Sequence, residues 1–333
     1  MARIDTLANF LTDIATAIKA KTGKTDVITP ANFDTEIAGI SSGDSEDLIT
    51  SYAATVDSSD GSSCTELPNG ITSIGDYAFY KKTNLGLTEL PDSITSIGYD
   101  GFYQCTNLAL TKLSANLETI GAYAFYGCSN MALTELPDNI KVINSYAFSG
   151  CSKLALTKLP ANLEEIKDYA FQSCSGMSIS GEFPSTLTKI GSYAFSNAGV
   201  GAVVIPDNVT SMNQRAFANS TITSIKIGTG ITYIDSQCFA NTTKLSKVTI
   251  YGDISSISAG AFNSSSALYT LLLPNVTKVP NLPNDYTIYS CPLRGGAGRV
   301  YVPDSLVDAF KAATYWSNLA SNIVPISEYG GEI

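Results

Sequence analysis

The residues with the clearest capacity for chemistry are four cysteines spaced 23 residues apart: Cys105, Cys128, Cys151 and Cys174. Stacked coils about 4.8 Å apart would bring neighbouring thiols within reach of a disulfide or a shared metal ion. The same position elsewhere holds other small residues, Ala198, Ser220, Thr242 and Ser265, so buried free thiols are the main prediction. No C-x-x-C pair occurs, and an odd total of seven cysteines leaves at least one thiol free.

Periodic tyrosines are a second candidate, in this case for binding. Each stands two residues before a repeated phenylalanine, and Asp100 interrupts the series: Tyr77, Tyr123, Tyr146, Tyr169 and Tyr193. An exposed column of tyrosines can stack against sugar rings while the hydroxyls bind their polar edges. The alternative is that tyrosine belongs to the repeat consensus and only covers the edge of each coil. Further aromatic residues favour the N-terminal end as the adhesive one: Tyr80, Tyr103 and Tyr126.

Charges alternate in sign, after the first pair, at another repeated position, which reads Glu66, Glu89, Lys112, Glu135, Lys158 and Glu182. Stacked coils would make each charge a neighbour of the next, so that opposite charges compensate one another across the coils. On this interpretation the series serves register and solubility alone. The alternative is an exposed polar face that contacts a partner through Glu89, Lys112, Glu135 and Lys158.

The composition excludes several classes of chemistry. The chain has no histidine, which removes the usual general base and the commonest metal ligand. A net charge of −10 without a basic cluster argues against a nucleic-acid partner. Asp57 and Asp60 do not complete a calcium loop. We therefore expect no enzyme, no cofactor and no metal site, although lysine or paired-carboxylate mechanisms stay open on composition alone.

These side chains are positioned by an internal repeat. A phenylalanine recurs at intervals of 22 to 24 residues, nine times: Phe79, Phe102, Phe125, Phe148, Phe171, Phe195, Phe217, Phe239 and Phe262. Apolar residues stand five, eight and twelve positions before each one, and proline often follows the residue at minus twelve. The pattern predicts a solenoid of about nine stacked coils, each with a short strand, a corner, an apolar return and a turn.

Two irregularities divide the repeats. The two classes differ in the register of their strand. The strand of early copies reads LALTELP, apolar at positions such as Leu110 and Leu113, whereas that of later copies alternates strictly, as at Ile225, Ile227, Val248 and Ile250. The single 24-residue interval lies between the two classes, near SGMSISGEFPS, where we expect an extra residue to bulge and the curvature or twist to change. Four residues before most phenylalanines stands Gly, Asn or Asp, as at Gly75, which predicts a corner with positive φ.

The segments outside the repeats complete the expected organisation. Residues 1–40 form a helical attachment module with an apolar face, and residues 41–61, rich in Ser, Gly and Asp, form a linker. The solenoid spans 62–290, and residues 291–333 form a C-terminal cap with a strand, a helix opened by Asp304 or Ser305, and a return around Trp316. No apolar stretch is long enough for membrane insertion, and no signal peptide is evident.

The repeat LTELPDNIKVINSYAFSGCSKL resembles that of BspA-like, or Treponema-type, leucine-rich repeat proteins, over roughly residues 62–273. This resemblance implies a right-handed leucine-rich-repeat solenoid with a parallel sheet, of the α/β repeat class, and a role similar to that of bacterial surface adhesins, which bind host proteins or other bacteria. The two ends resemble flanking modules on phage and prophage repeat proteins of gut Firmicutes.

Two locations follow for a non-enzymatic recognition protein. The leading expectation is a phage tail or receptor-binding component, with residues 1–40 docked to virion proteins and the solenoid in contact with the host surface. The lack of a signal peptide favours this location, because phage proteins leave the cell by lysis. The alternative is a bacterial cell-surface adhesin that binds a host protein or glycan. The sequence leaves the oligomeric state open.

Overall fold

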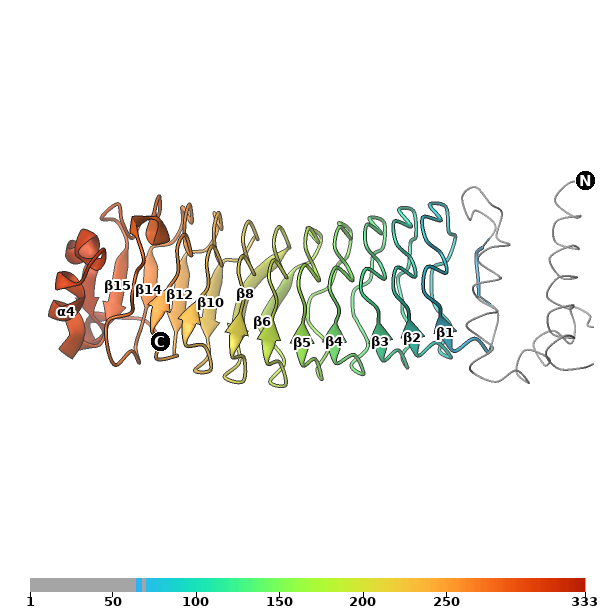
Figure 1. Cartoon of the computed structure of the whole chain (residues 1–333), viewed down its shortest axis with the longest axis horizontal. Coiled ribbons are helices and arrows are strands. Elements are labelled where there is room, and N and C mark those ends of the chain that lie inside the picture. Colours follow the sequence, from blue (N-terminus) through green and yellow to red (C-terminus); the bar gives the residue numbers. More distant parts are fainter. Residues whose placement is uncertain (1–63, 68–69, 333) are drawn as a thin grey trace, which may run out of the picture.

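The computed structural model describes residues 64–67 and 70–332. The expected helical module at 1–40 and the linker at 41–61 lie outside these residues. Coils follow one another along a single long axis, from β1 to the helix α4 at the C-terminal end (Figure 1). The solenoid with parallel sheets is therefore confirmed, and strand pairs of successive coils run parallel throughout the described ranges.

The core is a continuous column of phenylalanines. All nine repeated rings are fully buried, and successive rings stack with centroids 5.1–5.8 Å apart and planes within 14° of parallel. A single coil has no second layer to cover its apolar edge, so each coil depends on its neighbours for burial. A tenth coil follows, in which Ile288 takes the place of phenylalanine. The N–H of Phe262 donates to the carbonyl of Thr287, and Ile288 is buried in the phenylalanine position.

Short strands mark the return of each coil, at the isoleucine five residues before the phenylalanine. They are β1 (Ser73–Ile74), β2 (Ser96–Ile97), β3 (Thr119–Ile120), β4 (Val142–Ile143), β5 (Glu165–Ile166), β7 (Lys189–Ile190), β9 (Ser211–Met212), β11 (Tyr233–Ile234) and β13 (Ser256–Ile257). They form sheets of three (β1-β2-β3), four (β4-β5-β7-β9) and two strands (β11-β13).

Longer strands occur only in the later part of the described chain, where they form one seven-stranded sheet in the order β16-β15-β14-β12-β10-β8-β6. The strands are β6 (Ile179–Glu182), β8 (Val200–Ile205), β10 (Ser224–Ile227), β12 (Lys247–Ile250), β14 (Thr270–Leu272), β15 (Arg299–Val302) and β16 (Ile323–Pro325). Strict alternation predicts this sheet correctly, and Ile225 pairs with Val248 as expected. The prediction of a strand at LALTELP in the early coils is wrong. Only an isolated bridge joins Glu89 and Lys112 there.

The spacing of buried residues explains the difference. In an early coil Leu110 and Leu113 are both buried but three residues apart, so a strand with a two-residue period cannot turn both inward. In a later coil the three-residue gap falls between Ile222 and Ile225, before the strand, and Ile227 continues the alternation. The expected bulge is confirmed: the register of β6 and β8 shifts between Ile179 and Gly181.

The prediction that the corner residue, such as Gly75, has positive φ is wrong. Positive φ occurs instead two residues before and two after the phenylalanine, for example at Tyr77 (φ 59°) and Lys81 (φ 58°). Glycine four residues before the phenylalanine is explained by the approach of successive coils. A Cβ on Gly121 would lie 2.5 Å from the carbonyl carbon of Gly98.

The C-terminal segment contains the 3₁₀ helices η1 (Asp285–Ile288), η2 (Asp304–Leu306), η3 (Trp316–Asn322) and η4 (Ile326–Glu328), and one helix, α4 (Val307–Ala312). The buried Trp316 packs edge-on against Phe310 at 4.9 Å, and its indole N–H donates to the carbonyl of Pro280 at 2.8 Å. This aromatic pair covers the last coils, and the sheet itself continues through β15 and β16.

Candidate functional site

The backbone explains how tyrosines come to lie on one edge of the solenoid. At Tyr77, Phe79 and Lys81 the N–H groups donate to carbonyls of the following coil, at 2.9, 2.7 and 2.7 Å. Positive φ at the first and third of these residues turns all three N–H groups along the solenoid axis. The same conformation recurs at Tyr123, Tyr146, Tyr169 and Tyr193, with φ of 58–60°, so it places each tyrosine in line with the next.

Four of these rings form a stacked column. The centroid distances are 4.5 Å for Tyr123–Tyr146, 4.5 Å for Tyr146–Tyr169 and 4.6 Å for Tyr169–Tyr193. Arg215 closes the column, because its guanidinium lies 5.3 Å from the ring of Tyr193 and donates to the hydroxyl at 2.9 Å.

Tyr99 bridges the gap that Asp100 leaves in the column. Its ring meets Tyr77 edge-on at 5.4 Å and Tyr123 edge-on at 5.7 Å. A second column, Tyr80–Tyr103–Tyr126, stacks alongside with both centroid distances 4.9 Å. We call the nine tyrosines the tyrosine patch: Tyr77, Tyr80, Tyr99, Tyr103, Tyr123, Tyr126, Tyr146, Tyr169 and Tyr193.

Exposure within the tyrosine patch is uneven. Tyr77 is 54% exposed and Tyr99 is 40% exposed, whereas Tyr146, Tyr169 and Tyr193 are half-buried. Rings in a stacked column have both faces covered by their neighbours and present edges and hydroxyls to solvent. Ring faces suited to a sugar or a cation are therefore found at the N-terminal end, where the edge-on contacts of Tyr77 and Tyr99 leave space.

Asp100 lies within this end of the patch. The residue is only 7% exposed, and its Oδ1 is buried without a hydrogen-bond partner. Burial raises the pKa of Asp100, and the nearby Asp76 raises it further. Burial also raises the pKa of Tyr99 and Tyr103, and the Asp100 carboxylate adds to both shifts. A buried carboxylate without a donor is costly, so this position is chemically distinct from the rest of the patch.

Tyr99 and Asp100 are the site residues that sequence reasoning missed. It treated Asp100 only as an interruption of the tyrosine series. A usable signal was present, because a tyrosine stands directly beside the single acidic replacement.

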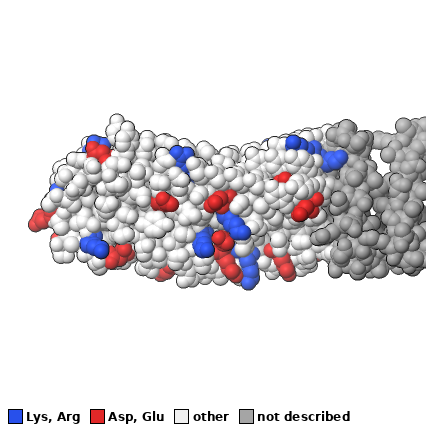
Figure 2. All heavy atoms as spheres, viewed as in Figure 1, with Lys and Arg blue, Asp and Glu red and all other residues white. Residues whose placement is uncertain are grey.

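The alternating charges at Glu89, Lys112, Glu135 and Lys158 are all exposed; we call them the charge ladder. Within the described residues no ion pair links them, so the expected compensation across coils does not occur through direct contacts. Lys112, Glu135 and Lys158 line a shallow hollow of about 280 Å³. Figure 2 shows side chains of both signs gathered over the middle coils of a face that is otherwise largely uncharged.

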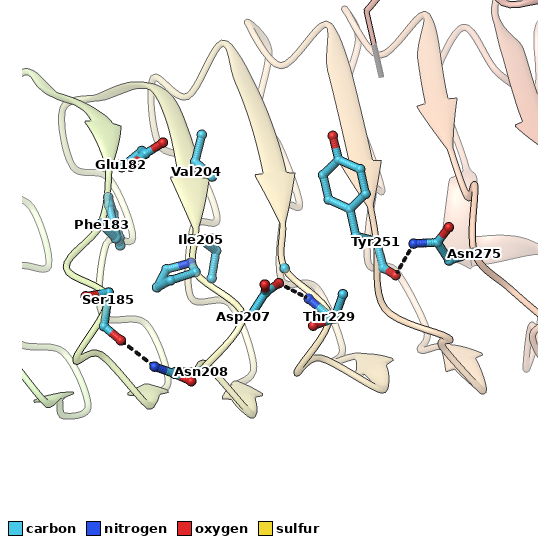
Figure 3. Close-up of a pocket in the computed structure, with 12 residues that line it drawn as sticks. Glu182, Phe183, Ser185, Val204, Ile205, Asp207, Asn208, Thr229, Tyr251 and Asn275 are labelled. Carbon is cyan, nitrogen blue, oxygen red and sulfur yellow. Dashed lines mark hydrogen bonds between the residues drawn. The ribbon is translucent and has the colours of Figure 1, made fainter.

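A larger hollow, about 890 Å³, crosses the corners that follow the long strands (Figure 3). Its polar groups already join successive coils, through hydrogen bonds from Asn208 Nδ2 to Ser185 O (2.6 Å), from Thr229 N to Asp207 Oδ1 (2.7 Å) and from Asn275 Nδ2 to Tyr251 O (3.0 Å). Three pairs of polar groups in this groove are therefore already engaged in holding the coils together.

The four periodic cysteines are fully buried free thiols, which confirms the predicted burial. Each donates to the carbonyl of a phenylalanine in the preceding coil, as Cys128 does to Phe102 at 3.0 Å. Ser265 makes the equivalent bond to Phe239 at 2.8 Å. The position does not require a donor, because Ala198 has none and Ser220 Oγ is buried without a hydrogen-bond partner among the described residues. Burial also raises the pKa of Cys128, Cys151 and Cys174, so these thiols are poor nucleophiles.

The described residues contain no group of three or more acidic or cysteine side chains placed to hold a metal ion. None of the helices in the described ranges has the length and apolar character needed to cross a bilayer. Asp57 and Asp60 lie outside the described residues.

Comparison with known proteins places the repeat in a family. The BspA type leucine rich repeat region matches in six copies, over residues 59–178 and 177–293. No curated protein matches the chain.

The chain is also similar to solved structures, among them the following three. A leucine-rich repeat protein from Bacteroides ovatus is 21% identical, with 78% of this chain and 83% of that chain covered and a TM-score of 0.43. A leucine rich cell surface protein from Faecalibacterium prausnitzii is 19% identical (79% and 84% covered, TM-score 0.44). The pneumococcal vaccine antigen PcpA is 16% identical (79% and 86% covered, TM-score 0.37). The family match spans more than half of the sequence, and the chain belongs to the BspA type leucine-rich repeat family.

Proposed function

We propose that this chain is a non-enzymatic recognition and adhesion protein of the bacterial cell surface. Its solenoid binds a host cell-surface protein or glycan through the tyrosine patch. The observation that carries the proposal is the patch itself, an ordered array of nine aromatic side chains with its most exposed rings, Tyr77 and Tyr99, at one end. Tyrosine contributes large contact area at a low cost in side-chain entropy, and it is enriched where proteins bind partners.

Family membership favours the cell surface over the phage particle. The resemblance that implies a surface adhesin is carried by the repeats, and the family matches these residues. The expectation of a phage tail component rests on the two ends of the chain, which lie largely outside the matched residues, and the comparisons give it no support. Docking of residues 1–40 to virion proteins belongs to that less supported location.

The charge ladder is a secondary contact surface in this proposal. Its four side chains are exposed and make no ion pairs with one another among the described residues. Alternating charge discriminates between partners more than it adds affinity. We therefore assign affinity to the tyrosine patch and selectivity to Lys112, Glu135 and their neighbours in the ladder.

Binding of the purified full chain to cultured epithelial cells tests the proposal. The double variant Tyr77→Ser with Tyr99→Ser removes the two most exposed rings of the patch, and we expect cell binding to fall about tenfold or more. Tyr269→Ser with Tyr286→Ser is the matched control, because these two tyrosines are comparably exposed, at 51% and 62%, and lie outside the patch. Equal binding by both double variants would remove the patch from the proposal.

Location needs a separate measurement. Antibodies against the solenoid should label intact cells of the producing bacterium. Labelling confined to phage particles released by lysis would instead establish the phage location and overturn the surface assignment, while leaving the role of the tyrosine patch to the binding assay.

A further inference from the structure

We propose that Asp100, with the rings of Tyr77, Tyr99 and Tyr103, forms a site for an alkylammonium group, namely the end of a lysine side chain on the partner protein. This inference rests on the proposed function and names the chemistry that the exposed end of the tyrosine patch selects. It therefore also chooses a protein over a glycan as the partner.

The carboxylate carries the first part of the argument. Asp100 is nine-tenths buried, and its Oδ1 has no donor within the described residues. The neighbouring Asp76 does not relieve it, because Asp76 Oδ1 accepts the N–H of Tyr99 and adds a second negative charge. A partner that delivers a positive charge would stabilise the carboxylate, and the partly buried position strengthens that attraction relative to bulk water.

The rings carry the second part. The face of a tyrosine ring attracts cations, and two rings of this same patch already hold one. Lys81 Nζ lies 5.0 Å from the centroid of Tyr80, and the guanidinium of Arg215 lies 5.3 Å from that of Tyr193. Tyr77 and Tyr99, which are among the most exposed rings of the patch, have no such cation among the described residues.

Carboxylate and rings coincide at one place. Asp100 follows Tyr99 directly in the chain, and its backbone carbonyl accepts the N–H of Tyr103 at 3.0 Å. Its charge also raises the pKa of both tyrosine hydroxyls, in addition to the effect of burial. A cation among these rings would therefore meet ring faces and carboxylate together. A sugar would satisfy the rings but bring only neutral hydroxyls, so the charge of Asp100 would remain uncompensated. The geometry favours the ammonium group.

The repeat supplies a matched variant. Other coils carry Ser-Tyr where this coil has Tyr99-Asp100, as at Ser145-Tyr146 and Ser192-Tyr193. The φ of Asp100, 54°, is close to that of the tyrosines at the same position. The double substitution Tyr99→Ser with Asp100→Tyr should therefore fold and extend the stacked column, while it removes the carboxylate.

Ligand-observed NMR on the full chain tests the site, with Nα-acetyl-lysine methylamide as the probe and Nα-acetyl-norleucine methylamide as its neutral counterpart. We expect weak binding of the lysine probe, on the order of millimolar, and at least about fivefold weaker binding of the norleucine probe. Asp100→Asn and the double variant should each weaken lysine binding about fivefold, with no loss of thermal stability, because each removes a buried, unpartnered charge. Asp308→Asn, which removes an exposed carboxylate from α4, should bind as the unmodified chain does.

Cell binding separates this inference from the proposed function. Acetylation of cell-surface amines should abolish patch-dependent binding, whereas enzymatic removal of surface glycans should leave it intact. If Asp100→Asn binds cells and the lysine probe as well as the unmodified chain does, the ammonium site is wrong even though the patch variants fail to bind. If glycan removal alone abolishes binding, the partner is a glycan and the inference is overturned.

Discussion

The early and later coils share one core but present different surfaces. Phe102 and Phe125 stack in the early coils as Phe217 and Phe239 do in the later ones, at 5.3 and 5.8 Å. The early coils have two-residue strands and carry the tyrosine patch. The later coils form a seven-stranded sheet. One buried residue lies fifteen positions before the phenylalanine in the early coils and fourteen positions before it in the later coils. This difference separates the two surfaces.

The comparison shows that core and surface are specified by different positions of the repeat. The phenylalanine, the buried apolar residue five positions earlier and, in most coils, a small residue three positions later are common to both regions. The residue two before the phenylalanine decides what the edge presents, and it changes from tyrosine to Arg215 and Gln237 in the later coils. The residue at this edge position can therefore change along the solenoid while the phenylalanine column stays the same.

The largest expected effect tests the shared core. Phe148→Ala in an early coil and Phe217→Ala in a later coil should each lower the free energy of unfolding by about 3–5 kcal/mol, because each removes a fully buried ring. Denaturant titration measures both. A cost below about 1 kcal/mol for either variant would mean that the phenylalanine column does not support that region.

A smaller effect should distinguish the regions by how closely the coils approach. A Cβ on Gly121 would meet three backbone atoms of the preceding coil within 2.7 Å, whereas one on Gly201, in β8, would lie 3.4 Å from its nearest neighbour. We expect Gly121→Ala to cost about 1–3 kcal/mol in thermal or denaturant unfolding and Gly201→Ala to cost much less. The reverse order would contradict the contact geometry.

Substitutions three residues after the phenylalanine should lower the free energy of unfolding by similar amounts in both regions. Cys128→Ala removes one of the two donors to the carbonyl of Phe102, which also accepts the N–H of Cys105, and Ser265→Ala removes a donor from Phe239. Each should cost about 1 kcal/mol, whereas Cys128→Ser should cost less because the hydroxyl restores the bond. Denaturant titration of the three variants decides the point, and a Cys128→Ala variant as stable as the unmodified chain would show that size alone matters.

The smallest effect concerns the border between the regions. Arg215→Ala removes the guanidinium from the face of Tyr193 and the bond to its hydroxyl. We expect a loss of about 0.5–1 kcal/mol, measured by thermal unfolding. Arg215→Lys keeps the charge but lacks the planar set of donors of a guanidinium. Its thermal stability should lie between that of the unmodified chain and that of Arg215→Ala. No change in either variant would mean that the column needs no cation at its end.

Much of the fold could be predicted from the sequence because its determinants are local and repeated. Nine phenylalanines at a nearly constant interval predict stacked coils, and strict alternation predicts β10 and β12. The strand expected at LALTELP does not form, because the buried residues there stand three apart and only an isolated bridge joins neighbouring coils. The tenth coil escaped notice because Ile288 replaces phenylalanine after 26 residues.

The candidate site was only partly predictable. Spacing alone brings Tyr123, Tyr146 and Tyr169 into one column. It does not show that the rings cover one another's faces, since that depends on the backbone at positive φ and on side-chain rotation. The role of Asp100 depends on burial without a donor, which no periodic pattern reveals.

Chemical footprinting tests most directly the central claim that the tyrosine patch at the early coils is the binding surface. Tyrosine nitration of the full chain, read by mass spectrometry, should modify Tyr77, Tyr99, Tyr269 and Tyr286 in the free protein, because all four are exposed. When the protein is bound to epithelial cells, we expect Tyr77 and Tyr99 to be protected while Tyr269 and Tyr286 still react. Protection of Tyr269 and Tyr286 with continued reaction at Tyr77 and Tyr99 would contradict the assignment and place the binding surface on the later coils.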